Sequence, residues 1–154
     1  MGRHATIGTA GLVLLGGLAA GCSAPGPGEA EIQDWLDERP RAVVDDAVAA
    51  MSAAVPAARP DAAEPAATLH IGQPADVAGL RAECLGDGTL LVTMEVPNAD
   101  GNEAVELEVD CGDGPHEESF ALPGAQSATV DVFGDADYVG AVYVEVLGET
   151  TSRR

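Results

Sequence analysis

The sequence contains no lysine, and its seven arginines are its only strongly basic side chains. Against them stand 26 acidic residues, which give a formal net charge of −19 at pH 7. Binding to nucleic acid or to anionic lipid headgroups through electrostatics requires a patch of lysine and arginine. Because such a patch cannot be assembled here, we expect no nucleic-acid partner and a solvated, acidic surface.

Aromatic residues and catalytic motifs are also scarce. With two Phe, two Tyr and one Trp, the chain lacks the rings for the aromatic-lined cleft of a glycosidase, although acids for a carboxylate pair are plentiful. A nucleophile needs a nearby base, and Ser119, three positions after His116, would lie on the opposite face of a strand. No nucleophile elbow, Walker loop, HExxH or CxxC pattern is present. We therefore expect no enzyme, no catalytic residues and no cofactor.

The start of the chain has the layout of an export signal. Arg3 and His4 give a basic beginning, and residues 7–18 form an uncharged apolar run. This run is too short for a membrane span, which needs roughly 20 residues. Small residues at 19–21 then precede Cys22, as expected before a cleavage site.

In these features residues 1–22 resemble the signal peptide and lipobox of bacterial lipoproteins. Leucine is usual three positions before the family's cysteine, whereas here Ala19 takes that place and Leu18 lies one step earlier. The resemblance implies that residues 1–21 are removed, that Cys22 carries a covalent diacylglycerol, and that this lipid anchors the protein at the extracytoplasmic face of the cell membrane. An ordinary secretory signal with an incidental cysteine is the alternative. The lack of lysine, with abundant Ala and Gly, suggests a GC-rich genome such as that of an actinobacterium.

Cys84 and Cys111 remain once Cys22 is lipidated. Two thiols in an exported chain can pair, so we expect a disulfide between them. A metal site at these cysteines is the rival interpretation. It would need two further ligands, and His70 and His116 have no metal-like spacing.

Residues 29–55 have apolar positions every three or four residues, which is typical of an amphipathic helix. Pro40 interrupts this segment, and we expect a break near Arg39 because the residue before a proline is biased away from helix. The apolar stripe must be covered by the rest of the chain, by a second copy or by another protein. Trp35, the only tryptophan, either packs within the chain or anchors a partner.

Segments rich in proline, glycine or alanine surround this helix. Residues 22–28 are predicted to be a flexible tether and residues 56–67 a linker to the following domain. Residues 151–154 are predicted to be a disordered tail.

From Thr68 onward the apolar period becomes two, as in antiparallel strands with one buried and one solvated face. Residues rich in Gly, Asp, Asn and Pro separate these strands and favour turns. The sequence therefore predicts a mainly β fold, in which residues 68–150 form a small antiparallel β-sandwich of about seven strands, Ig-like or jelly-roll-like. The predicted turns are 86–88, 97–102, 112–115, 123–124 and 134–137.

The two downstream cysteines fit this sandwich. Both have the parity of buried residues, and pairing of residues 89–96 with 103–111 places Cys111 near Gly88, close to Cys84. A bridge there closes a loop of about 28 residues and contributes roughly 3 to 4 kcal/mol by the chain-entropy argument.

A weak calcium candidate lies in one predicted turn. Asn98, Asp100 and Asn102 place oxygen donors at alternating positions, as hard cations require. The later ligands of a calcium loop are missing, however, and the same residues are favoured in turns on conformational grounds. We therefore expect a turn and no metal site.

These features together predict a lipid-anchored envelope protein that displays a β-sandwich for binding or accessory contacts with another envelope protein. The alternative is a structural spacer with no specific ligand. A binding module should expose an uncharged patch, for which the outward-facing Leu91, Tyr143 and Leu147 are candidates together with Trp35. A spacer should be acidic all round.

Overall fold

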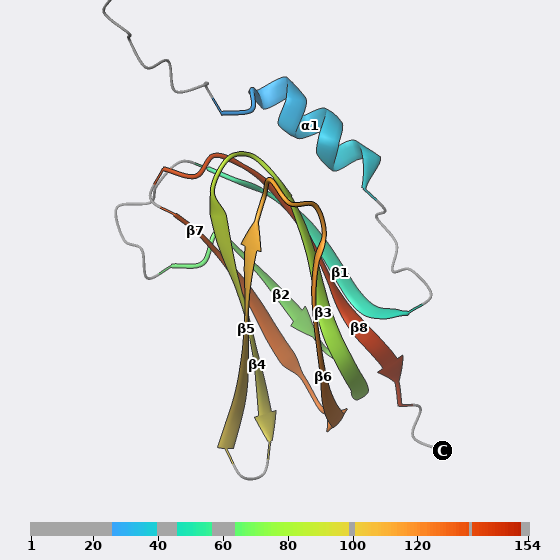
Figure 1. Ribbon diagram of the computed structural model, residues 1–154. Helices are drawn as coiled ribbons and strands as arrows, with labels where there is room; N and C mark the ends of the chain where they lie inside the picture. Colours follow the sequence, from blue (N-terminus) through green and yellow to red (C-terminus); the bar gives the residue numbers. More distant parts are fainter. Residues whose placement is uncertain (1–25, 40–45, 57–63, 99–100, 136, 152–154) are drawn as a thin grey trace, which may run out of the picture.

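The computed structural model describes residues 26–39, 46–56, 64–98, 101–135 and 137–151, which form a β-sandwich with one short helix (Figure 1). Helix α1 spans Glu29–Glu38 and carries acidic residues in its first turn, where they complement the helix dipole. No helix in these ranges is long and apolar enough to cross a membrane. The strands are β1 (Ala47–Val55), β2 (Ala67–Ile71), β3 (Ala75–Leu85), β4 (Thr89–Asn98), β5 (Gly101–Asp110), β6 (His116–Ala125), β7 (Ala128–Gly134) and β8 (Gly140–Thr150).

The strands form two antiparallel sheets of four. Sheet A has the order β1-β8-β3-β6, and sheet B has the order β2-β7-β4-β5. First and last strands pair, as do second and seventh, third and sixth, and fourth and fifth. The chain is therefore one long antiparallel hairpin folded into two sheets, which is the jelly-roll arrangement of two Greek keys. The predicted sandwich is confirmed, with eight strands rather than about seven.

The core lies between the two sheets and follows the period-two pattern of the sequence. Alternate residues of each central strand point inward and lose almost all contact with solvent, because successive side chains of a strand lie on opposite faces. Most are aliphatic, so the core is built from small branched side chains rather than rings. The fully buried side chains include Leu80, Leu90, Val92, Met94, Val109, Val130, Val132, Val142, Val144 and Val146.

The second half of the predicted helical segment is a strand, so helix through residue 55 is wrong for Ala47–Val55. In this alanine-rich stretch apolar residues recur both every two and every three to four residues, so periodicity cannot distinguish a strand from a helix. Pairing with β8 decides the outcome: Met51 and Val55 pack on the core, whereas Ser52 is exposed. The first half is confirmed, since α1 ends at Glu38 and Arg39 is extended.

Because β1 belongs to the sandwich, the segment between residues 56 and 67 connects two strands and not two domains. The sandwich therefore begins at Ala47 rather than at residue 68. The predicted signal peptide, Cys22, most of the tether, residues 40–45, residues 57–63 and the last three residues of the predicted tail lie outside the described residues.

The predicted turn at 123–124 is a bulge inside β6. Ala75 pairs with Ala125 and Val77 with Leu122, so three residues on β6 span what two span on β3. Gly124 has φ +64° there, and its N–H donates to Asp76 Oδ1 over 2.6 Å. Glycine accepts this left-handed conformation at low cost, which explains why the sequence signal is that of a turn.

The disulfide between Cys84 and Cys111 is present and joins the end of β3 in sheet A to the end of β5 in sheet B. The predicted neighbourhood is confirmed, because the Cys111 N–H donates to the Gly88 carbonyl over 3.1 Å. Tyr138, only 1% exposed, lies beside the bridge with its hydroxyl 3.5 Å from Cys111 Sγ, and this hydroxyl donates a hydrogen bond to the Leu85 carbonyl oxygen over 2.8 Å. The bridge and this ring together close one end of the core.

We predict that replacing both Cys84 and Cys111 with alanine lowers the free energy of unfolding by about 3 to 4 kcal/mol, by the chain-entropy argument for two residues 27 apart. Urea unfolding followed by circular dichroism measures the change. Dithiothreitol should destabilise the native chain similarly and leave the double variant unaffected. Equal stability of the two proteins in oxidising buffer contradicts the prediction.

Candidate functional site

The two outer faces of the sandwich differ in how far they are covered. On sheet A, the outward side chains of the central strand β8 are buried, with Tyr143 7% and Glu145 4% exposed. On sheet B, Leu91 of the central strand β4 is 37% exposed, and it is the only exposed large hydrophobic side chain among the described residues. The outer side of β8, a central strand of sheet A, is therefore buried, although residues of the flanking strands such as Ser52 and Glu117 are exposed, whereas the central strand β4 of sheet B presents Leu91 to solvent.

Helix α1 covers one end of sheet A, where it contacts β8 and β1 (Figure 1). Ile32 is its buried residue. The half-buried Trp35 ring lies 4.0 Å from the Arg39 guanidinium carbon, a cation–π contact, and Arg39 Nη2 lies 2.7 Å from Glu83 Oε1 on β3. The helix thus contacts the sandwich of the same chain, and Trp35 stacks on the arginine that makes the ion pair to β3.

An ionic network centred on Arg81 occupies the middle of the same face. Arg81 lies directly between Glu117 of β6 and Glu145 of β8 in the strand register. Its Nε is 3.0 Å from Glu117 Oε2, its Nη1 is 3.2 Å from Glu145 Oε2, and its Nη2 is 3.5 Å from Asp46 Oδ2. The hydrogen bond to Glu117 is the main cause that raises the pKa of Arg81. One guanidinium therefore links three strands of sheet A.

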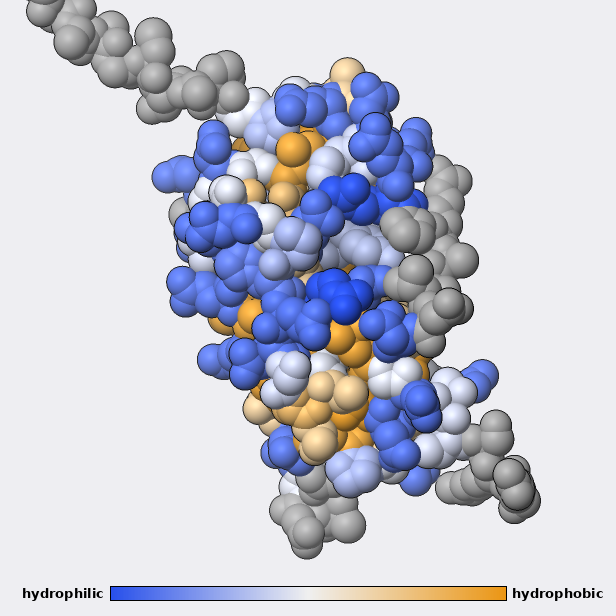
Figure 2. All heavy atoms as spheres, turned by 45° about the vertical axis from the view of Figure 1, so that its right-hand side comes forward, coloured by the Kyte–Doolittle hydropathy of each residue, from blue (hydrophilic) through white to orange (hydrophobic). Residues whose placement is uncertain are grey.

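Glu145 is the one buried charged residue in the described part of the chain. Its Oε2 accepts a hydrogen bond from Arg81 Nη1, and its Oε1 accepts a hydrogen bond from the Tyr143 hydroxyl over 3.0 Å. Burial, and then the contact with Glu145, raise the pKa of Tyr143 to about 12. Each carboxylate oxygen thus has a donor, which a buried carboxylate needs. Figure 2 turns this side of the molecule forward and shows mostly hydrophilic residues from α1 to the middle of the sandwich.

The prediction that Tyr143 and Leu147 are exposed partner contacts is wrong. Both point away from the core as their parity requires, but they are only 7% and 8% exposed. They belong to a central strand that is flanked by β1 and β3 and is contacted by α1. Leu91 lies on the other sheet, so the three residues do not form one patch.

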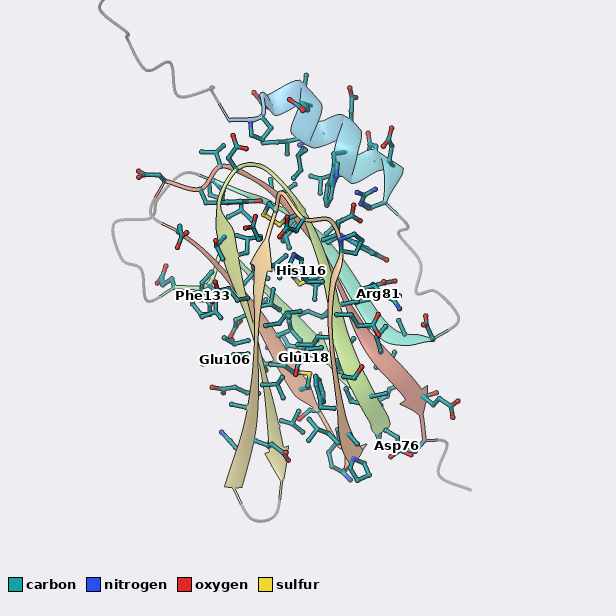
Figure 3. The ribbon with its side chains drawn as sticks, viewed as in Figure 1. Asp76, Arg81, Glu106, His116, Glu118 and Phe133 are labelled. Carbon is teal, nitrogen blue, oxygen red and sulfur yellow. A yellow bond between two sulfur atoms is a disulfide. The ribbon has the colours of Figure 1, made fainter. Side chains whose placement is uncertain are left out.

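The open face of sheet B is centred on Leu91. In the strand register Leu91 lies between Phe133 of β7 and Glu108 of β5. Together with Thr89 and Asp135 these side chains line an open hollow of about 390 Å³. Phe133 was missed in the sequence, although its parity with the outward Asp131 could have indicated it. In Figure 3, Phe133 and Glu106 lie on the side of the sandwich opposite Arg81.

Acidic side chains surround this apolar centre. Glu95, Glu106, Glu108 and Asp131 are outward residues of sheet B, where Asp131 accepts a hydrogen bond from the Thr68 hydroxyl. Arg39 and Arg81, the two arginines that the structure describes, both bind carboxylates on sheet A. Within the described ranges no arginine therefore neutralises the face of sheet B.

The two histidines that the structure describes, His70 and His116, lie on different sheets and make hydrogen bonds within the sandwich. His70 Nδ1 is 3.2 Å from Thr129 Oγ1 on sheet B, and His116 Nε2 is 3.0 Å from the Asp110 carbonyl oxygen. Ser119 is on β6, where it pairs with Gly79.

Of the calcium candidates, the structure describes only Asn102 in full. Asn102 lies in β5 opposite Pro97, and the backbone of Asn98 pairs with Gly101. Asp100 and the side chain of Asn98 lie outside the described residues. In the part of the chain that is described, no group of three or more His, Cys, Asp or Glu side chains is arranged to hold a metal ion.

Comparisons with protein-family models, curated proteins and solved structures found no match. The candidate site is therefore defined by the geometry of this chain alone: an open apolar centre, Leu91 and Phe133, in an acidic sheet face.

We predict that Arg81→Met lowers the free energy of unfolding, because it leaves the buried Glu145 carboxylate without a cation. We expect about 2 kcal/mol, below the usual cost for a fully buried pair, since the Arg81 side chain is 32% exposed. The double variant Arg81→Met/Glu145→Met should recover most of this loss in urea unfolding. A loss below about 0.5 kcal/mol, the scale of a surface ion pair, would show that the network contributes little to the stability of the fold.

Stability should also fall at high pH through the two tyrosines. Burial raises the pKa of Tyr138 to about 12, and the pKa of Tyr143 is likewise about 12. Unfolded tyrosines ionise near 10, so this stabilisation is complete below pH about 10 and is lost as pH rises from about 10 to about 12. Tyrosinate absorbance at 295 nm should be nearly absent from the folded protein at pH about 10.5, where urea-unfolded protein is more than half ionised. A midpoint near 10 in the folded state contradicts this prediction.

Proposed function

We propose that this protein is a non-enzymatic binding module, held at the extracytoplasmic face of the cell membrane by a diacylglycerol on Cys22, and that the outer face of sheet B contacts another envelope protein. The observation that carries this proposal is the difference between the two faces. On sheet A the outer side of the central strand β8 is buried, with α1 and the Arg81 network against it, whereas the central strand β4 of sheet B presents Leu91 to solvent.

The make-up of the sheet B face suits a protein partner. Leu91 and Phe133 form an apolar centre between Thr89 and Thr93, and acidic side chains form the surroundings. Protein interfaces commonly place aromatic and aliphatic residues at the centre and polar residues at the rim. Antiparallel strands also hold these side chains in a fixed register, so little order has to be gained on binding.

Two observations support the lipid anchor. Residues 1–22 resemble the lipoprotein signal, and the bridge between Cys84 and Cys111 leaves Cys22 as the third cysteine of the chain. In addition, α1 lies at one end of the sandwich, and the end of β4 and the start of β5 lie at the other (Figure 1). A tether entering through α1 would therefore hold the sandwich by one end and leave the sheet B face accessible along its length.

The alternative function is an acidic spacer without a specific ligand. It is favoured by the charge of the chain, −19 overall, and by the carboxylates that surround even the apolar centre of sheet B. The two functions differ in whether sheet B has a discrete partner.

Site-specific photocrosslinking in intact cells separates these functions. A benzoylphenylalanine at Thr93, on the open face, should give a discrete adduct that mass spectrometry identifies, whereas the same group at the exposed Ser52 on sheet A should not. Leu91→Asp should reduce the Thr93 adduct about tenfold, as expected for a residue at an interface centre. Equal labelling from both positions, or no adduct from a membrane-bound protein, supports the spacer.

The anchor is tested in the same cells with Cys22→Ala. The variant should leave the membrane fraction, and its Thr93 adduct should be lost because the partner is reached from the membrane. If Cys22→Ala remains in the membrane fraction like the native protein, the lipid anchor is wrong whatever the crosslinking shows.

A further inference from the structure

Strand β5 is an open edge of sheet B. It lies last in the order β2-β7-β4-β5 and pairs with β4 over its whole length without a register shift. An edge strand exposes a row of backbone N–H and C=O groups that can pair with an added strand. Natural edges are often blunted by charged side chains, especially lysine, by proline or by bulges; β5 has no proline and no bulge, and its charged side chains are all acidic. The facing edge strand β6, by contrast, has the Pro123–Gly124 bulge.

The register identifies which groups of β5 are available. Because the Cys111 N–H donates to the Gly88 carbonyl directly opposite, the odd-numbered residues of β5 bond to β4. In an antiparallel ladder the intervening residues point their backbone groups the other way. Ala104, Glu106 and Glu108 therefore present N–H and C=O groups to the open edge. Asp110 is the next residue whose backbone faces the edge, but its carbonyl oxygen already accepts a hydrogen bond from His116 Nε2 over 3.0 Å. The free part of the edge therefore ends before Asp110.

The side chains on this edge select the charge of an added strand. Glu106 and Glu108 are exposed on the outer face beside the free backbone groups. A second copy pairing β5 with β5 would place these glutamates opposite each other, which is unfavourable between strands. Basic side chains at the same positions would instead form cross-strand ion pairs.

The inner side of the edge offers apolar contacts to an added strand. Val105 of β5 and Phe120 of β6 pack on the core but remain partly exposed between the two sheet edges. Near the start of β5, Val96, Pro97 and Leu122 line a groove of about 310 Å³, together with the carboxylate-bearing Glu103 of β5 itself. Alternate side chains of an added strand would point toward this opening, because strand side chains alternate between faces.

We propose that the β5 edge binds an extended segment of a partner protein in which basic and apolar residues alternate, and that this segment becomes a fifth strand of sheet B. The inference rests on the proposed binding function and specifies its partner: basic side chains lie on the Glu106 and Glu108 side, and apolar side chains lie toward Val105 and the groove. The backbone groups of Ala104, Glu106 and Glu108 supply the hydrogen bonds.

The test uses a capped ten-residue peptide of alternating lysine and valine, with a glutamate–valine peptide as control. Titration into the full chain, followed by ¹⁵N NMR and amide hydrogen exchange, should show binding of the lysine peptide alone. The amides of Ala104, Glu106 and Glu108 should exchange at least about tenfold more slowly, while amides of the opposite edge strand β2 stay unchanged. Unchanged exchange at all three β5 amides overturns the inference.

Two variants strengthen the test. Glu106→Pro removes an N–H that the β4 ladder does not use, so it should abolish peptide binding and leave β4 paired. Glu106→Lys/Glu108→Lys should exchange the preference, binding the glutamate peptide and rejecting the lysine peptide. If the proline variant fails to fold, this second variant still tests whether the peptide binds at the β5 edge. An unchanged preference for the lysine peptide would contradict binding at that edge.

The outcome is also separable from that of the proposed function. Peptide-induced shifts confined to Leu91, Thr93 and Phe133, with no protection along β5, overturn strand addition and leave the sheet B face as the binding surface. The same holds if Thr93 gives its crosslinked adduct in cells while Glu106→Pro captures the partner as well as the native chain does.

Discussion

The Cys84–Cys111 bridge is the constraint on which the rest of the sandwich depends. It joins sheet A to sheet B at the end where β3 leaves one sheet and β5 leaves the other. Tyr138, the largest fully buried side chain, fills the same end and donates to the Leu85 carbonyl oxygen. Gly140 lies so close that an added Cβ would overlap that oxygen. A core of small aliphatic residues is thus closed by one covalent bond and one ring.

The distribution of positive charge determines what each face of the molecule can do. Arg39 holds α1 to β3 through Glu83, and Arg81 neutralises the buried Glu145. Both described arginines therefore act on sheet A, where desolvated carboxylates would otherwise be costly. The carboxylates of sheet B stay in solvent and need no partner for stability. The same arrangement that compensates the buried carboxylate of sheet A leaves the face of sheet B acidic.

Much of the sandwich could be predicted from the sequence because apolar residues, which point inward, alternate with polar residues, which point outward, along most strands. The disulfide followed from parity and from one turn, which correctly placed Cys111 beside Gly88. Strand β1 could not be predicted, since an alanine-rich stretch satisfies helical and extended spacings equally and its pairing with β8 depends on residues far along the chain. The bulge at Gly124 has the same local signal as a turn.

The candidate site was predicted less well, for a different reason. Parity tells which way a side chain points from its sheet, but not whether another element lies over it. Leu91 and Tyr143 have the same outward parity, yet only Leu91 is exposed, because α1 packs against sheet A and no described helix packs against sheet B. Exposure on a sheet face is thus set by tertiary contacts that no local pattern contains.

The position of Glu83 next to Cys84 has a mechanical consequence. Glu83 forms an ion pair with Arg39 at the end of α1, and the neighbouring Cys84 is joined covalently to sheet B by the disulfide. Consider a force that pulls sheet B away from the chain that precedes α1. The disulfide would transmit this force covalently from sheet B to sheet A. The weakest contact along its path would then be the noncovalent contact of α1 with sheet A. Under tension the helix should separate from the sandwich before the two sheets separate, so that the chain lengthens while the sandwich stays folded.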